Sequence, residues 1–134
     1  MIRILLVDDD DINNFLLKHL LKKSGFDVQG EVFTNPIEAI AYIKKCKTEA
    51  NVIDLLLLDI NMPLLSGWEV LDELRLTGET LISGNRIYML SSSVHSTDIE
   101  QAEKYKEVMG FISKPIGLSQ LTEIFAGIAA SKLE

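Results

Sequence analysis

Short apolar runs alternate along the chain with segments of helical character, and this alternation restricts the possible folds more than any other feature. The runs predicted as strands are 2–7, 28–33, 54–59, 86–91 and 110–113. Strands that are apolar throughout belong to parallel sheets covered by helices on both faces. The pattern therefore predicts an α/β fold, a doubly wound sheet of five parallel strands with five helices.

Five segments carry the helix signals: 11–24, 36–47, 67–76, 96–107 and 118–130. The apolar or aromatic residues of the first segment that recur at helical spacing are Ile12, Phe15, Leu16, His19 and Leu20. Asn35 and Pro36 supply an N-cap followed by proline in the first helical position of the second. The apolar stripe of the last segment is Leu121, Ile124, Phe125 and Ile128. The connection 77–85, from Thr77 to Asn85, is longer than most.

Length and composition limit the function classes. We expect one domain, residues 1–134, because the chain is close to the commonest domain size. The net charge of -7 argues against direct nucleic-acid binding, and no apolar run reaches the roughly 20 residues of a membrane span. Cys46 is the only cysteine and no signal peptide is visible, which indicates a cytoplasmic protein. Cys46 lies in a Lys-rich helical stretch, which favours a surface or core thiol over a nucleophile.

Charged side chains directly follow three of the predicted strands. Asp8 and Asp9 follow the first strand, Asp59 ends the third, and Lys114 follows the fifth. The carboxyl ends of parallel strands meet at one edge of the sheet, so these groups should converge there. Adjacent carboxylates repel each other unless a cation compensates, and oxygen ligands of this kind suit Mg²⁺. The sequence therefore predicts a site for a divalent cation and a phosphoryl group.

Each of these side chains also has a simpler interpretation. Asp10 and Asp11, in the same acidic run, are best explained as helix-capping residues. A lone Asp59 could cap a turn, and a lone Lys114 could be a solvated surface charge. The hydroxyl of Ser91 also stands at a strand end, the fourth. The joint order of these residues, each at a strand end, favours the functional interpretation over the simpler ones.

With these residues in this order, the whole chain resembles the receiver domain of bacterial two-component response regulators (CheY-like). The resemblance implies a flavodoxin-like sheet with strand order 2-1-3-4-5. It makes Asp59 the phosphoacceptor. It also makes Asp8, Asp9, Asp59 and the backbone carbonyl of Asn61 the ligands of Mg²⁺ or Mn²⁺, with Asp9 a direct ligand and Asp8 acting largely through water.

The same resemblance assigns a conformational switch. Lys114, before a cis-disposed Pro115, would bind a phosphoryl oxygen, Ser91 would turn its hydroxyl towards the phosphoryl group, and Phe111 would move into the vacated space. Asn61 and Ser93 would tune hydrolysis. The output surface would be the fourth helix, the fifth strand and the fifth helix.

Three positions depart from the family pattern. Ser66 replaces a frequent Asp, but serine is also an N-cap, so the loop should survive. The small residues usual before the fifth strand are replaced at 106–108, so we expect an irregular end to the fourth helix. Gly117 replaces a frequent Asp cap on the last helix. These changes affect the output face more than the phosphorylation site.

The resemblance implies a signalling switch that assists its own phosphorylation and dephosphorylation, and not a conventional enzyme. Its expected partners are a sensor histidine kinase or a histidine phosphotransfer protein, together with a downstream protein target. Dimerisation on phosphorylation is a further expectation. The chain is either a stand-alone receiver or a part of a longer protein.

Two alternatives remain at this point. A haloacid-dehalogenase-like phosphatase also uses a strand-terminal Asp with Mg²⁺, but it needs a second acid where this chain has Asn61. The other alternative is a degenerate receiver that only binds proteins. The residues that argue against it are the intact Asp8, Asp9, Asp59, Ser91 and Lys114.

Overall fold

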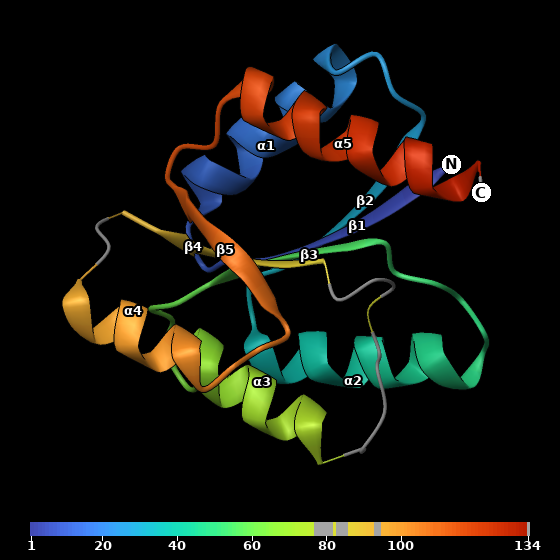
Figure 1. The fold of residues 1–134 in the computed structure, drawn as a ribbon. Coiled ribbons are helices and arrows are strands. Elements are labelled where there is room, and N and C mark those ends of the chain that lie inside the picture. The colour runs from blue at the N-terminus through green and yellow to red at the C-terminus, as the bar shows by residue number, and fades with distance from the viewer. Residues whose placement is uncertain (77–81, 83–85, 93–94, 134) are drawn as a thin grey trace.

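A five-stranded parallel sheet forms the centre of the molecule (Figure 1). The computed structural model describes residues 1–76, 82, 86–92 and 95–133. The strands are β1 (Ile2–Val7), β2 (Val28–Phe33), β3 (Leu55–Asp59), β4 (Ile87–Ser91) and β5 (Val108–Ser113). Their order is β2-β1-β3-β4-β5 and every pair is parallel. The predicted fold class and strand order are confirmed.

Helices cover both faces of this sheet. They are α1 (Asp11–Lys23), α2 (Pro36–Thr48), α3 (Gly67–Arg75), α4 (Ser96–Glu103) and α5 (Leu118–Lys132). Helices α1 and α5 lie on one face, and α2, α3 and α4 lie on the other (Figure 1). Both termini lie at the end of the sheet where β1 begins (Figure 1). The opposite end, where the strands stop, is left to the loops that carry the charged residues.

The leucine run of β3 supplies both halves of the core. Leu55 and Leu57 pack on the side of α1 and α5, whereas Leu56 and Leu58 pack on the side of α2 and α3. Successive side chains of a strand point to opposite faces, so an unbroken apolar run fills two cores at once. All four leucines are fully buried, and each such burial stabilises the fold by about 2 kcal/mol. This burial holds β3, and with it Asp59, in the middle of the sheet.

The face of α1 that turns towards the sheet differs from the one that the apolar stripe predicted. The helix forms where predicted, with the Asp10 carboxylate accepting hydrogen bonds from the backbone N–H groups of Ile12 and Asn13. Three large apolar side chains of the stripe are exposed instead of buried: Ile12, Phe15 and Leu16. The buried residues of this helix are Asn13, Asn14 and Leu17. The polar pair faces inward because it meets the end of β1, where polar partners are present.

The segment before β5 differs from the prediction. Helix α4 ends at Glu103 and not near Glu107, and β5 begins at Val108, two residues earlier than expected. Tyr105 is buried, and continuing the helix would conflict with the chain's return to the sheet at this point. A register shift between β4 and β5 takes up the extra residue Met109. The structure therefore differs from the prediction in where α4 ends and where β5 begins, and the irregularity lies in the pairing of β4 with β5.

Helix α3 holds the turn between α4 and β5 through polar and aromatic contacts. The Tyr105 hydroxyl donates a 2.7 Å hydrogen bond to Asp72, and the Tyr105 and Trp68 rings lie 5.1 Å apart. The Arg75 guanidinium lies over the Tyr105 ring and donates two 2.8 Å hydrogen bonds to the Glu107 carboxylate. This forked pairing lowers the pKa of Glu107.

Some predictions concern residues that the structure does not describe. The connection 77–85 is described only at Ile82, which is buried and forms a parallel bridge with Ile53. Ser93 and Glu134 lie outside the described residues. Cys46 is a buried free thiol, in keeping with the core position that the sequence allowed. Among the described helices, none is both long and apolar enough to cross a membrane.

Candidate functional site

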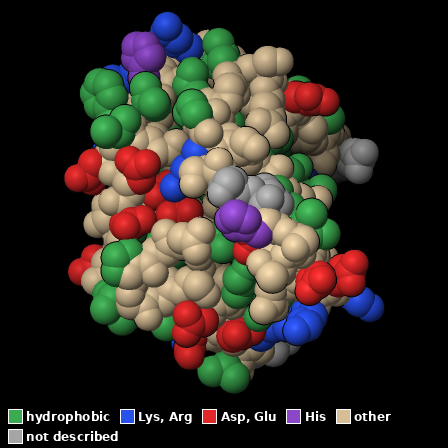
Figure 2. Space-filling model, turned by 90° about the vertical axis from the view of Figure 1, so that its left-hand side faces the viewer, with side chains coloured by type: hydrophobic (Ala, Val, Ile, Leu, Met, Phe, Trp, Pro, Cys, Tyr) green, Lys and Arg blue, Asp and Glu red, His purple; other side chains and the backbone are tan. Residues whose placement is uncertain are grey.

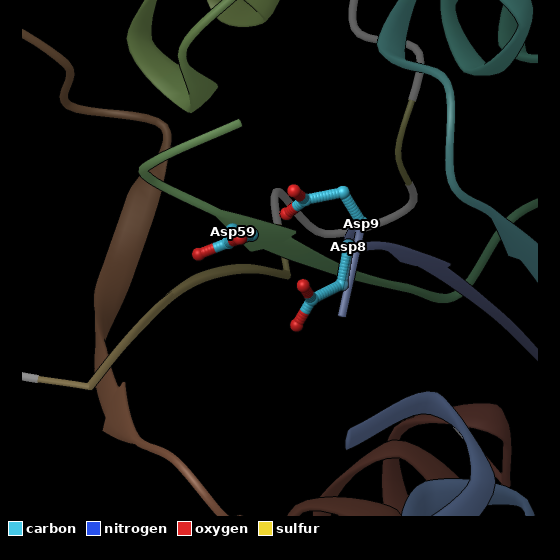
Figure 3. Close-up of side chains that lie close together, drawn as sticks. All are labelled: Asp8, Asp9 and Asp59. Atoms are coloured by element: carbon cyan, nitrogen blue, oxygen red, sulfur yellow. The ribbon is translucent and has the colours of Figure 1, made fainter. Parts of the chain in front are cut away.

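Three carboxylates meet at the end of the sheet where the strands stop. Asp8 and Asp9 directly follow β1, and Asp59 is the last residue of β3. One carboxylate oxygen from each lies within 4.8 Å of the others. Figure 3 shows the three side chains projecting from the two strand ends towards the same side. In Figure 2, which views the molecule from the side where the strands end, acidic atoms gather around a small basic group.

Lys114 joins this cluster from the end of β5. Its ammonium Nζ lies 2.8 Å from Asp8 Oδ2 and 3.2 Å from Asp59 Oδ1. The backbone N–H of Lys114 donates to the carbonyl of Ser91, which ties β5 to β4 at this level. The bond between Lys114 and Pro115 is cis, as the resemblance implied. The convergence of Lys114 with the carboxylates was predicted, whereas its particularly short contact with Asp8 was not.

Asp8 is held by α1 through contacts that the sequence analysis missed. Its Oδ1 accepts a 2.9 Å hydrogen bond from the backbone N–H of Asp10, and its Oδ2 accepts a 2.8 Å hydrogen bond from Asn13 Nδ2. The neighbouring Asn14 donates to the Asp8 main-chain carbonyl at 2.9 Å. Two adjacent asparagines in the first turns of a helix were the available signal, since such residues are unfavourable there unless they bond specifically.

The electrostatics of the site are those of crowded, buried negative charge. Burial raises the pKa of Asp59 to about 7, the charge of Asp8 adds to the rise, and Lys114 opposes it. Burial alone would lower the pKa of Lys114, but its bonds to Asp8 and Asp59 outweigh burial and raise it. One cation therefore does not fully compensate the carboxylates of this site.

The loop after Asp59 brings α3 close to the site. The backbone N–H of Gly67 donates to the carbonyl of Ile60, and a Cβ on Gly67 would lie 2.5 Å from the Asp59 carbonyl oxygen. Ser66 caps α3 in a reciprocal pair with Glu69, so the loop survives the replacement of the usual acid. Asn61 lies in this loop and is exposed.

Ser91 and Phe111, the two predicted switch residues, differ in burial and in position. Ser91 is the buried last residue of β4, next to β3 in the sheet. Phe111, in β5, is partly buried, and its ring lies edge-on to Trp68 with the centroids 6.3 Å apart. The Phe111 ring therefore packs against Trp68 of α3.

The donor set fits a hard divalent cation. Two of the three carboxylates are buried, Asp9 is exposed, and their oxygens are close enough to share one ion. Mg²⁺ is commonly bound by one or two carboxylates together with water and phosphate oxygens. The raised pKa of Asp59 reflects burial first and the charge of Asp8 second, and a bound cation would favour the ionised carboxylate against both.

Comparison with known proteins decides the family. A family model described as the response regulator receiver domain matches residues 4–126. The chain belongs to the response regulator receiver domain family. This receiver domain is thus a component of two-component signalling and acts as a signalling switch. Family membership also decides against the phosphatase alternative.

The receiver domain is similar to proteins of different organisms. The chain is 30% identical to the two-component response regulator ORR41 of Oryza sativa subsp. japonica, over 94% of this chain and 93% of that protein. It is 29% identical to hybrid signal transduction histidine kinase I of Dictyostelium discoideum, over 91% of this chain. The chain spans only 7% of the length of that kinase.

A solved structure supports the same assignment. The crystal structure of a two-component response regulator from Cytophaga hutchinsonii matches with a TM-score of 0.79 and 27% identity. The match covers 96% of each chain. The receiver fold therefore extends over almost the whole chain.

Proposed function

We propose that Asp59 accepts a phosphoryl group from a phosphohistidine of a partner protein. The observation that carries the proposal is the position of Asp59 at the end of the central strand, within reach of both Lys114 and the other two carboxylates. An Asp59 oxygen would attack the phosphorus, forming an O–P bond as the N–P bond to histidine breaks. The histidine leaves with the bonding electron pair and the product is an acyl phosphate on Asp59.

The other residues of the cluster then have separable roles. Asp8, Asp9, Asp59 and the Asn61 carbonyl are the proposed ligands of Mg²⁺, with Mn²⁺ as a substitute. The bound cation supplies positive charge that offsets the charge on the phosphoryl oxygens during transfer. Lys114, whose Nζ is 3.2 Å from Asp59 Oδ1, is the proposed partner of a phosphoryl oxygen.

The proposed output is a change in the surface formed by α4, β5 and α5. Ser91 would turn towards the phosphoryl group and Phe111 would follow, which biases an existing equilibrium between two conformations. The Phe111 ring lies edge-on to Trp68 of α3, so its movement would also reach α3. Asn61 and Ser93 are proposed to tune the hydrolysis through which the domain reverses its own signal.

The proposed partners are a sensor histidine kinase or a histidine phosphotransfer protein as donor, and a protein target. The similarity to a segment of a hybrid histidine kinase supports a phosphohistidine donor. We propose residues 1–134 as a single receiver domain, located in the cytoplasm, whose reducing conditions suit a buried free thiol. Direct nucleic-acid binding is not expected, and dimerisation could accompany phosphorylation.

Phosphorylation by acetyl phosphate with Mg²⁺, followed by intact-protein mass spectrometry, tests the proposal. Wild-type protein should gain one phosphoryl group, and Asp59→Asn should gain none because it lacks the attacking carboxylate. Asp11→Asn is the matched control, since Asp11 belongs to the same acidic run as Asp8 and Asp9 but lies in the first turn of α1. Acyl phosphate on folded Asp59→Asn would refute the assignment, and its absence from wild type would favour the degenerate receiver.

A further inference from the structure

The Asp8 carboxylate is fully buried, and Lys114 and α1 both contact it. Its Oδ2 lies 2.8 Å from Lys114 Nζ and also accepts a 2.8 Å hydrogen bond from Asn13 Nδ2. The other oxygen, Oδ1, accepts from the backbone N–H of Asp10. The neutral Asn13 amide and the Lys114 ammonium thus contact the same oxygen of Asp8.

The Lys114 ammonium group has different partners in this structure and in the proposed reaction. In this structure it bridges Asp8 and Asp59, whereas the function proposed above requires it to bind a phosphoryl oxygen on Asp59. When Lys114 leaves Asp8, a buried carboxylate oxygen would lose its charged partner. A buried acceptor without any donor is costly, so a second donor at Oδ2 decides whether Asp8 keeps its orientation.

Asn13 has the properties that this second donor needs. Its amide is neutral, so it can orient a carboxylate without competing with a divalent cation for negative charge. It is also fixed in place, being 6% exposed and lying in the first turn of α1, where its backbone N–H donates to the capping Asp10 carboxylate. Hydrogen bonds to metal-binding carboxylates set their orientation, and losing them weakens metal binding.

We propose that Asn13 is a positioning residue of the phosphorylation site. Its amide holds the Asp8 carboxylate in the orientation that serves Mg²⁺, and it keeps that orientation while Lys114 exchanges Asp8 for a phosphoryl oxygen. The proposal rests on the proposed function, because the exchange of partners by Lys114 is part of it. Asn13 itself does not contact the phosphoryl group.

The chain offers a matched control beside Asn13. Asn14 is buried to the same degree on the same helix, but it donates to the Asp8 main-chain carbonyl and not to the carboxylate. Replacing either residue by alanine removes one buried amide and one hydrogen bond to Asp8. A role that is merely structural would make the two variants alike, whereas carboxylate positioning separates them.

Isothermal titration with Mg²⁺ measures the effect without any phosphorylation. Asn13→Ala should weaken Mg²⁺ binding about tenfold, and Asn14→Ala less than about twofold. Thermal unfolding in EDTA shows whether each variant is folded. Asn13→Leu, which removes the donor with less loss of volume, replaces Asn13→Ala if alanine prevents folding, with the same expected loss. Equal weakening by the Asn13 and Asn14 variants would overturn the proposal.

A double-mutant cycle with Lys114→Met gives a readout that a structural role would not move. Asn13 and Lys114 share one oxygen of Asp8, so their effects on the Mg²⁺ dissociation constant should differ from additivity by about threefold or more. Additive effects would mean that Asn13 does not act through that oxygen, and the proposal would fail.

Wild-type behaviour separates this failure from failure of the proposed function. If wild type binds Mg²⁺ and is phosphorylated by acetyl phosphate, but a folded Asn13 variant binds Mg²⁺ within twofold of wild type, the positioning role is wrong and the function stands. If wild type neither binds Mg²⁺ nor is phosphorylated, the proposed function fails, and the proposal that rests on it fails with it.

Discussion

Asp59 is a carboxylate that the fold keeps beside another buried carboxylate, Asp8. Burial raises its pKa from the ordinary value of 3.8 to about 7, and the charge of Asp8 adds to the rise. A folded protein that binds a proton more tightly than the unfolded chain loses stability as the pH rises between these two values. The ionised Asp59 carboxylate therefore destabilises the folded protein above neutral pH in the absence of metal.

Asp59→Asn should be more stable than wild type at pH 8 in EDTA. The unfolding free energy of the variant should exceed that of wild type by on the order of 2 kcal/mol at pH 8, because the charged carboxylate is gone. The difference should shrink towards zero as the pH falls from 7 to 4, where Asp59 becomes protonated in wild type. Urea unfolding at several pH values measures this. A difference that does not change between pH 4 and pH 8 would contradict the assigned cause.

At the scale of elements, the approach of α3 to β3 sets the geometry of the site. A Cβ on Gly67 would lie 2.5 Å from the Asp59 carbonyl oxygen and 2.7 Å from the Met89 side chain. Main chain cannot move aside as a flexible side chain can. The first residue of α3 must therefore be glycine for the helix to start this close to the acceptor strand.

Gly67→Ala should destabilise the protein by about 1–3 kcal/mol and weaken Mg²⁺ binding, because α3 and Asp59 must separate. Gly127→Ala is the control, since a Cβ there meets nothing within 4 Å in the interior of α5. That change should stabilise the protein by about 0.5–1 kcal/mol by favouring the helix. Urea unfolding together with Mg²⁺ titration checks both. Unchanged stability in Gly67→Ala would show that α3 can shift without cost.

At the scale of the whole molecule, net charge and topology act together. The chain carries a net charge of -7, and its sheet brings three carboxylates to one edge. General screening by salt reduces the repulsion among all acidic groups, whereas a bound divalent cation acts only where its ligands converge. Stability should therefore depend on the identity of the cation and not only on ionic strength.

Magnesium chloride should raise the melting temperature more than sodium chloride at the same ionic strength. A ligand that binds only the folded state at about ten times its dissociation constant adds about 1.4 kcal/mol. Asp9→Asn should remove the additional effect of magnesium chloride, because it removes one proposed ligand of the cation. Asp9 is the exposed member of the cluster, so it can be replaced without leaving a buried gap. Differential scanning calorimetry measures the difference. An equal effect of the two salts on wild type would argue against a specific cation site.

Much of the candidate site could be predicted from the strand ends alone. Asp8, Asp9, Asp59 and Lys114 each follow an apolar run, and parallel strands carry such residues to a common edge whatever the details of packing. The boundaries that proved wrong lie where local signals were weakest. Helix α4 ends at Glu103 because burial of Tyr105 overrides a pattern that continued to Glu107.

The alternation of strands and helices, and hence the edge at which the charges meet, can be read from local patterns, because apolar periodicity and strand ends are local properties. Two features depend instead on packing between distant segments: the face of α1 that turns inward, and the carboxylate that Lys114 approaches most closely. Ile12, Phe15 and Leu16 of the apolar stripe face solvent, and Asn13 faces Asp8. Unpaired buried polar groups are costly, so the hydrogen bonds that Asn13 and Asn14 donate to Asp8 at the end of β1 can outweigh the apolar pattern of the helix itself.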